Sequence, residues 1–304
     1  MERLHITDVC LRDGLQNQAV QVSTEAKLTL AQRLVEAGVA SVEATSFVSP
    51  KAVPQMADAA QVVLGLQHRL PLLRTSVLVP NLKGLERASQ AGCQEVAVVL
   101  SATEEMNRRN INMGLAQARE ESAAVLREAR ARGIRTRAYV AVAFDCPFEG
   151  ATPLDRVKGL AAEMHAAGAE EVVIADTIGS AFPGEVRLRM IELSDVVPLD
   201  RLAIHLHDTR GMGVANAWAA LDAGVRRFDA SVGGIGGCPF APGAAGNVAT
   251  EDLVLLAENS GFDTGIVPVA LLDAVEYAQS LLGRPLGGHS ARWLMRQRAE
   301  AGRR

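Results

Sequence analysis

The sequence predicts a (β/α)8 barrel built as a single domain over residues 1–304, with about 265–304 as a C-terminal helical appendage. Strand and helix patterns alternate along nearly the whole chain, and about eight such units fit into about 260 residues, the usual size of these barrels. The strands are short and rich in Val, Ile and Ala, as parallel strands covered by helices are. No G-x-G-x-x-G sequence follows the first strand, which argues against an open dinucleotide-binding sheet.

Short apolar runs are expected to form the barrel strands. The first of them begins almost at Met1, so we expect no signal peptide. The predicted strands cover 4–10, 39–47, 74–80, 95–101, 134–144, 170–177, 201–208 and 226–232.

Between the strands, apolar residues recur at helical spacing. Ser23 or Thr24 caps the first helix and Gly38 ends it, while Pro54 and Pro183 each open a helix. The polar stretch ATEEMNRRNINMG is expected to be a loop. The other predicted helices cover 24–38, 82–91, 115–132, 153–167, 213–223, 249–260, 268–282 and 289–301.

Composition bounds the class of protein. The chain is 48% hydrophobic with a net charge of −4, so it can bury a full core and has no basic excess that would indicate a nucleic-acid partner. Its 4 cysteines are scattered, and no C-x-x-C spacing suggests a disulfide framework or a zinc ribbon. No apolar run approaches the roughly 20 residues that cross a bilayer. We therefore expect a cytoplasmic protein with no membrane or nucleic-acid partner.

Polar residues gather where the predicted strands end. In (β/α)8 barrels the carboxyl ends of the strands, with the loops that follow them, build the active site. Residues from distant parts of the chain are therefore expected to share one rim. They are Arg12, Asp13 and Gln16 after the first strand, Glu43 in the second, the Asn107–Asn112 loop after the fourth, Asp176 and Thr177 at the sixth, His205 and His207 at the seventh, and Cys238 and Asn247 after the eighth.

His205 and His207 are expected to point to the same side of their strand, because side chains alternate along a strand. Two adjacent imidazoles can bind one metal ion; the alternative is one surface and one core histidine. With Asp13 and Asn247 they give a mixed oxygen and nitrogen set that suits a divalent ion with positions open for substrate. Mg²⁺ or Mn²⁺ is the expected ion, with Zn²⁺, Co²⁺ and Fe²⁺ as alternatives.

Three charged residues allow two interpretations each. Arg12 can stabilise a developing oxyanion, or it can pair with a local acid at the surface. Glu43 and Asp176 are carboxylates in apolar strands, where they must be paired or protonated. Each can serve the metal site and proton transfer, or form a structural pair with a barrel arginine such as Arg137.

Cys238 follows a run with four glycines within Gly233–Gly237, which allows backbone conformations that other residues avoid. A thiol on such a loop can act as an acid or a base. Both candidate histidine bases are assigned to the metal, so proton transfer is favoured over covalent catalysis. The alternative is an inert cysteine buried in a tight turn.

These motifs resemble the 3-hydroxy-3-methylglutaryl-CoA lyase family of metal-dependent (β/α)8 lyases. The most specific is the glycine-rich cysteine loop, and the others point only to the wider group that includes Claisen-condensing enzymes. Arg210 stands where the family commonly has Tyr, which leaves the acyl specificity open. The resemblance rests on LRDGLQNQ, EATSFVSPKAVPQM, VPNLKGLERA, RRNINM, CPFEG, ADTIG, HLHDTRG and SVGGIGGCPFAPGAAGNVATEDLV.

The resemblance implies a retro-Claisen cleavage of 3-hydroxy-3-methylglutaryl-CoA to acetyl-CoA and acetoacetate, as in leucine degradation. It also implies a homodimer. Arg12 would stabilise the enolate oxygen and Cys238 would take part in proton transfer. The implied sets are Arg12, Asp13, Glu43, Asp176, His205, Cys238 and Glu251 for catalysis, Arg12, Gln16, Asn107 and Asn110 for substrate binding, and Asp13, His205, His207 and Asn247 for the metal.

Three other functions stay open. One is the same reaction on a related branched 3-hydroxyacyl-CoA. Another is a Claisen-condensing acyltransferase of the isopropylmalate-synthase type, although that class lacks the GGCPF loop. The last is a non-catalytic binding barrel, which is disfavoured because every residue of the expected metal set is present.

Overall fold

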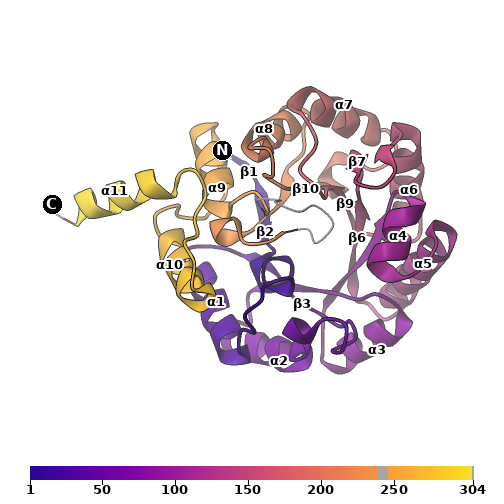
Figure 1. The fold of residues 1–304 in the computed structure, drawn as a ribbon, viewed down its shortest axis with the longest axis horizontal. Coiled ribbons are helices and arrows are strands. Elements are labelled where there is room, and N and C mark those ends of the chain that lie inside the picture. Colours follow the sequence, from indigo (N-terminus) through magenta and orange to yellow (C-terminus); the bar gives the residue numbers. More distant parts are fainter. Residues whose placement is uncertain (238–245, 303–304) are drawn as a thin grey trace.

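The computed structural model describes residues 1–237 and 246–302, and within them parallel strands form a closed barrel. The strands follow one another around the barrel in sequence order, and β11 pairs with β2 to close it (Figure 1). The predicted fold class is confirmed. The barrel strands are β2 (His5–Asp8), β3 (Ser41–Ser46), β4 (Arg74–Leu78), β5 (Glu95–Ser101), β6 (Arg135–Ala141), β9 (Glu171–Asp176), β10 (Leu202–Leu206) and β11 (Arg227–Ala230).

Helices surround the strands on the outside, as the apolar periodicity predicts (Figure 1). The Ser23 hydroxyl accepts a hydrogen bond from Ala26 N and caps the first of them, and Pro183 begins α7. The helices are α1 (Thr24–Glu36), α2 (Ala59–Arg69), α3 (Leu82–Gln90), α4 (Glu104–Ile111), α5 (Leu115–Ala131), α6 (Leu154–Ala166), α7 (Pro183–Leu193), α8 (Gly213–Asp222), α9 (Thr250–Asn259), α10 (Leu271–Leu282) and α11 (Ala291–Ala301).

Helix α4 replaces most of the loop predicted between β5 and α5, so that prediction was wrong. Ion pairs from Glu104 to Arg108 and from Glu105 to Arg109, each four residues apart, stabilise the helix. Asn112 ends it in a left-handed conformation with φ of 55°. Short pairs of strands that the sequence did not predict are β1 (Glu2–Arg3) with β12 (Phe262–Asp263), and β7 (Asp145–Cys146) with β8 (Gly150–Ala151).

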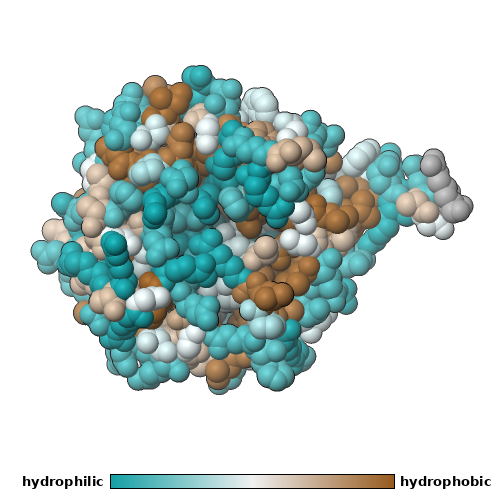
Figure 2. Space-filling model, turned by 180° about the vertical axis from the view of Figure 1, so that it is seen from behind, coloured by the Kyte–Doolittle hydropathy of each residue, from teal (hydrophilic) through white to brown (hydrophobic). Residues whose placement is uncertain are grey.

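The barrel has two apolar layers. A large cluster lies between the strands and the helices, and a small one inside the barrel contains Leu78, Ala97, Tyr139, Val173 and Ala203. Below that small cluster, towards the amino ends of the strands, Glu171 forms ion pairs with Arg137 and Arg227. Figure 2 shows this end of the barrel, with hydrophilic residues around its centre. In (β/α)8 barrels the functional groups gather at the opposite, carboxyl end of the strands.

The C-terminal part of the chain lies beside the barrel. Helix α10 packs against α1, while α11 extends away from the body of the protein (Figure 1). Leu294 of α11 is buried, whereas Trp293 beside it is 50% exposed. Across residues 1–237 and 246–302, we find no helix with both the length and the hydropathy that a membrane span requires.

Candidate active site

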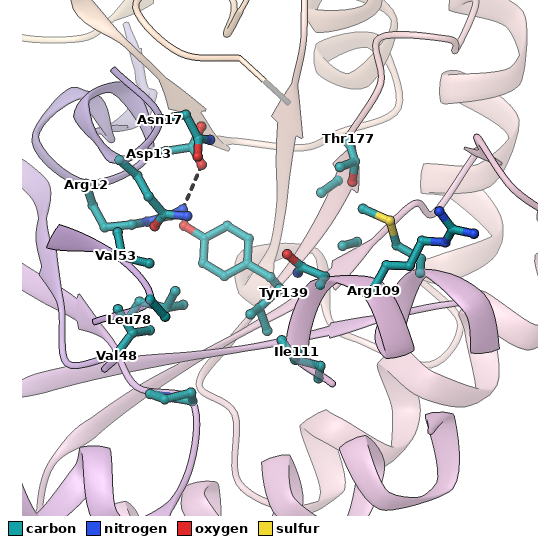
Figure 3. A pocket seen from close by; sticks show the side chains of 18 of the residues that line it. Arg12, Asp13, Asn17, Val48, Val53, Leu78, Arg109, Ile111, Tyr139 and Thr177 are labelled. Carbon is teal, nitrogen blue, oxygen red and sulfur yellow. Dashed lines mark hydrogen bonds and ion pairs between the residues drawn. The ribbon is translucent and has the colours of Figure 1, made fainter. Parts of the chain in front are cut away.

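A cavity of about 510 Å³ opens at the carboxyl end of the barrel (Figure 3). One side of it is polar and includes Arg12, Asp13, His205 and His207. Apolar side chains line other parts of its wall, among them Val48, Val53, Leu78, Val99, Met106, Ile111 and Met113. A polar centre next to an apolar wall is typical of a small-molecule site, because few polar groups orient the ligand while apolar contacts hold it.

The turn η1 (Cys10–Gly14) brings Arg12 and Asp13 into this cavity. It is a π-helical turn, a rare conformation that is often found at functional sites. Arg12 Nε donates to Glu43 Oε2 at 2.6 Å, and its Nη1 donates to Asp13 Oδ1 at 2.7 Å. Figure 3 shows the Arg12 side chain beside Asp13, with the Tyr139 ring in the middle of the view. Both acids hold the guanidinium in place.

Asp13, His205 and His207 form a group that could hold a metal ion, because their ligand atoms all lie within 4.8 Å of one another. The Nε2 atoms of the two imidazoles are 3.1 Å apart. Asn247 joins the group by donating from Nδ2 to Asp13 Oδ2 at 2.9 Å, and its Oδ1 is buried without a hydrogen-bond partner. Converging ligand atoms and an unsatisfied amide oxygen fit a bound cation.

The protonation states of Asp13 and His207 also suit a cation. Burial disfavours ionisation of Asp13, but Arg12 and the two imidazoles outweigh that effect and lower the pKa of its carboxyl to about 2. Burial and the neighbouring His205 lower the pKa of His207 to about 4. At neutral pH Asp13 is therefore a carboxylate and His207 a neutral imidazole, which are the forms that bind metals.

Asp229 is a residue of this site that the sequence analysis missed. Its Oδ2 lies 3.3 Å from His205 Nδ1 and accepts a hydrogen bond from the Tyr139 hydroxyl at 2.7 Å. Its Oδ1 accepts from Arg137 Nη2 at 2.7 Å. Burial opposes ionisation of Asp229, yet Arg137 and His205 keep its pKa well below the usual range. A carboxylate at Nδ1 keeps the proton there and leaves Nε2 free to bind a metal. An aspartate inside the apolar strand RRFDASV was the available signal.

Glu43 lies beside the site and does not pair with Arg137. It is fully buried, contacts Arg12 through Oε2, and has no hydrogen-bond partner at Oε1. Burial raises the pKa of its carboxyl, and Arg12 counteracts this only partly. The strand pairing shifts register between Glu43 and Thr45, which is how a bulge redirects a side chain. Glu43 thus pairs with Arg12 in place of the pairing with Arg137 that was considered for it.

Asp176 holds the turn after β9 and does not line the cavity. Its Oδ1 accepts from Ser180 N at 2.9 Å and its Oδ2 from Ala181 N at 3.1 Å. Burial raises the pKa of its carboxyl. The next residue, Thr177, does line the cavity, and its hydroxyl oxygen accepts from Val142 N at 2.8 Å. Asp176 therefore shapes the turn that carries Thr177 and does not pair with Arg137, while its part at the metal site or in proton transfer stays a prediction.

The remaining predicted residues divide into three groups. Gln16 and Asn110 line the cavity, as expected of substrate ligands. Asn107 does not: its amide is fully buried and bonds to Ser101 N, Ser101 O and Thr103 O, so we correct its role to holding the backbone before α4. Glu251 does not line the cavity either, since its carboxylate accepts from Gly233 N and Gly288 N. Cys238 lies outside the residues that the structure describes.

Comparison with known proteins gives consistent results. The profile of the HMGL-like family matches residues 3–277. The chain is 42% identical over 283 residues to the mitochondrial hydroxymethylglutaryl-CoA lyase of Pongo abelii, covering 93% of this chain and 87% of that protein.

Solved structures agree with this. The hydroxymethylglutaryl-CoA lyase of Pseudomonas aeruginosa superposes with a TM-score of 0.93 at 39% identity, covering 97% of this chain and 98% of that one. An HMG-CoA lyase from Acinetobacter baumannii, solved with coenzyme A and 3-methylmalate, gives a TM-score of 0.90 at 37% identity and covers 95% of this chain and 94% of that one.

Proposed function

The chain belongs to the HMGL-like family, as its motifs predict, and from this we propose that it is a carbon–carbon lyase that cleaves 3-hydroxy-3-methylglutaryl-CoA to acetyl-CoA and acetoacetate. The observation that carries the proposal is the meeting of Arg12, Asp13, His205 and His207 in one cavity. These groups can hold a divalent ion and stabilise an enolate, which are the two requirements of a retro-Claisen cleavage.

The ion would be held by Asp13, His205, His207 and Asn247. When bound, it supplies Lewis acidity that lowers the pKa of the substrate's tertiary hydroxyl. Mg²⁺ or Mn²⁺ is the proposed ion, because carboxylate and amide oxygens favour these cations and two positions can remain for substrate oxygens. The buried, unsatisfied Asn247 Oδ1 supports this donor set.

The bond changes of the reaction are simple. A base takes the hydroxyl proton, the electron pair of the O–H bond becomes the second C–O bond of the acetoacetate ketone, and the C2–C3 bond breaks. The electrons of that bond pass to the thioester, giving the enolate of acetyl-CoA, which then takes a proton at its carbon. Arg12, held by Glu43 and Asp13, can donate to the enolate oxygen from a fixed position.

The enolate also needs a proton donor. We assign this step to Cys238 because its motif matches the family's cysteine loop. Glu43 is a buried carboxyl whose pKa is raised. Its Oε2 contact makes it a positioning partner of Arg12, and its unpaired Oε1 offers a second site for a proton.

The direct test is product analysis. Purified protein with Mg²⁺ or Mn²⁺ should convert 3-hydroxy-3-methylglutaryl-CoA to equal amounts of acetyl-CoA and acetoacetate. Mass spectrometry measures both products. The Asp13→Asn protein, which keeps the shape of the side chain, is the control and should form neither. No cleavage by the wild-type protein would overturn the proposal.

A related branched 3-hydroxyacyl-CoA is the second candidate substrate. The Acinetobacter baumannii relative was solved with 3-methylmalate, a smaller hydroxy dicarboxylate, which supports retaining this candidate. Comparing kcat/KM for the thioester of each acid separates the two. A Claisen-condensing acyltransferase would instead join acetyl-CoA to a keto acid with hydrolysis of the thioester, and the free CoA released can be measured with a thiol reagent.

Three broader proposals accompany the reaction: a homodimer, a cytoplasmic location and a place in leucine degradation. The family resemblance supports the first and third, and the absence of an apolar run long enough to cross a bilayer supports the second. Sedimentation velocity, cell fractionation and growth of a deletion strain on leucine would test them.

A further inference from the structure

The connection between α10 and α11 lies against the rim of the active site. Its residues Gly287–Ser290 form hydrogen bonds to η4 (Val232–Gly234), to the first turn of α9 and to the turn after β10. None of its residues is among those that line the cavity. The segment nevertheless contacts the Asp208 side chain, which follows His207, and the backbone of η4, just beyond which Ile235 contacts Asn247.

Glu251 links this segment to η4. Its Oε2 accepts from Gly233 N at 3.0 Å and its Oε1 accepts from Gly288 N at 2.7 Å. Gly287 N also donates directly to Gly233 O at 3.2 Å. Just beyond η4, the Ile235 carbonyl oxygen accepts a hydrogen bond from Nδ2 of the Asn247 side chain at 3.0 Å. The segment therefore supports the backbone that orients Asn247.

His289 links the same segment to the turn after β10. Its Nε2 lies 2.8 Å from Asp208 Oδ2, and Asp208 directly follows His207. Asp208 also accepts from Gly213 N at 2.7 Å, which fixes the start of α8. Asp252 in turn holds the backbone of His289 and Ser290, accepting from their amides at 2.7 Å and 2.8 Å.

The packing leaves no space for a side chain at Gly288. A Cβ there would lie 2.4 Å from Asp252 Oδ2 and 2.6 Å from Ala249 Cβ. Gly287 has a φ of 127°, which L-residues with side chains rarely adopt. The two glycines thus allow the segment to approach α9 closely enough for both carboxylates to reach its amides.

We propose that residues Gly287–Ser290 hold the metal-site rim in its binding geometry, and that Glu251, Asp252 and His289 are positioning residues for Asn247 and His207. The proposal rests on the proposed metal site. It assigns to Glu251 a role through backbone contacts instead of acid–base chemistry, because both of its oxygens already accept hydrogen bonds from amides.

The test measures Mn²⁺ binding to metal-free protein by electron paramagnetic resonance of the unbound ion. His289→Ala should weaken Mn²⁺ binding about 3- to 10-fold. This is less than the loss in metal affinity of about 10- to 100-fold that follows removal of a residue hydrogen-bonded directly to a metal ligand. His289→Gln keeps a donor that can reach Asp208 and should bind within about twofold of wild type. Arg284→Ala, at an exposed residue of the same connection, is the matched control and should not change binding.

Hydrogen exchange provides a readout that does not depend on metal. In metal-free His289→Ala, the amides of residues 208–213 should exchange at least about fivefold faster than in wild type, while those of α3 stay unchanged. Wild-type affinity together with wild-type exchange in His289→Ala would overturn the proposal. Failure of the proposed function would give a different result. His289→Ala would still differ from wild type in Mn²⁺ binding and amide exchange, but the wild-type protein would not cleave the thioester.

Discussion

Asn247 donates a hydrogen bond of 2.9 Å to Asp13, although the two residues are 234 positions apart in the chain. The contact exists because β11 pairs with β2 and closes the barrel, which brings the residues after the last strand to those after the first. Completion of the metal site therefore depends on closure of the barrel. Variants that weaken this closure should lose metal affinity before they lose secondary structure.

Arg12 is expected to be the residue whose exact chemistry matters most to turnover. Arg12→Lys should lower kcat about 10²- to 10³-fold, because one ammonium group cannot contact Glu43, Asp13 and the enolate oxygen together. Arg33→Lys on α1, away from the cavity, is the control. Steady-state kinetics checks this, and a kcat above a tenth of wild type would contradict the role.

Asp229 should control metal binding through His205. Asp229→Asn removes the charge that keeps the imidazole in its metal-binding form, so Mn²⁺ should bind about 10- to 100-fold more weakly. Tyr139→Phe removes one donor to Asp229 and should have a smaller effect in the same direction. Tyr277→Phe is the matched control. Isothermal titration calorimetry distinguishes the three, and unchanged affinity in Asp229→Asn would refute the arrangement.

Cys238→Ser should lower kcat severely and leave Mn²⁺ affinity nearly intact, because a hydroxyl is a far weaker acid than a thiol. Cys93→Ser is the control, since burial raises the pKa of the Cys93 thiol to about 12 and makes it inert. Single-turnover kinetics with a deuterated solvent would show whether the proton-transfer step has slowed. Near-normal turnover of Cys238→Ser would remove the cysteine from the mechanism.

Glu251 should make stability depend on pH. Burial raises the pKa of its carboxyl to about 7 in the folded protein, above the value of about 4.3 expected in the unfolded chain. The folded state therefore binds the proton more tightly, so this stabilising contribution is complete below about pH 4 and is lost as pH rises through 7.

Urea unfolding in chelator at pH 5, 6, 7 and 8 measures this effect. The free energy of unfolding of the wild type, minus that of Glu251→Gln, should fall by about 1 to 3 kcal/mol across this range. A difference that is constant or increases with pH would count against a raised pKa for Glu251.

The sequence was sufficient to predict the barrel and the proximity of His205 to His207. Alternation of side chains along an extended chain places His205, in β10, and His207, just after it, on one side. Parallel strands bring the residues at their carboxyl ends together. Periodic apolar residues likewise located the helices to within a few positions. These features depend on local geometry, which a sequence encodes directly.

Other features depend on contacts that no local pattern contains. Asp229 could be linked to His205 only once neighbouring strands had a register. Glu251 and Asp176 carry carboxyl groups, as Asp13 does, and the sequence alone does not tell the three apart. In the structure the oxygens of Glu251 and Asp176 accept hydrogen bonds from backbone amides, and neither residue lines the cavity. The helix α4 was missed because its first turns are polar, and its stability comes from ion pairs and from the Asn107 contacts.

One divalent ion, held by Asp13, His205, His207 and Asn247, is expected to be required for cleavage. The most direct measurement is turnover of metal-free protein during titration with Mn²⁺, with bound metal counted in parallel. We expect no acetoacetate without metal, full recovery at one ion per chain, and neither tight binding nor recovery in His205→Ala. Undiminished cleavage in chelator, or a His205→Ala protein that binds Mn²⁺ as wild type does, would contradict the account.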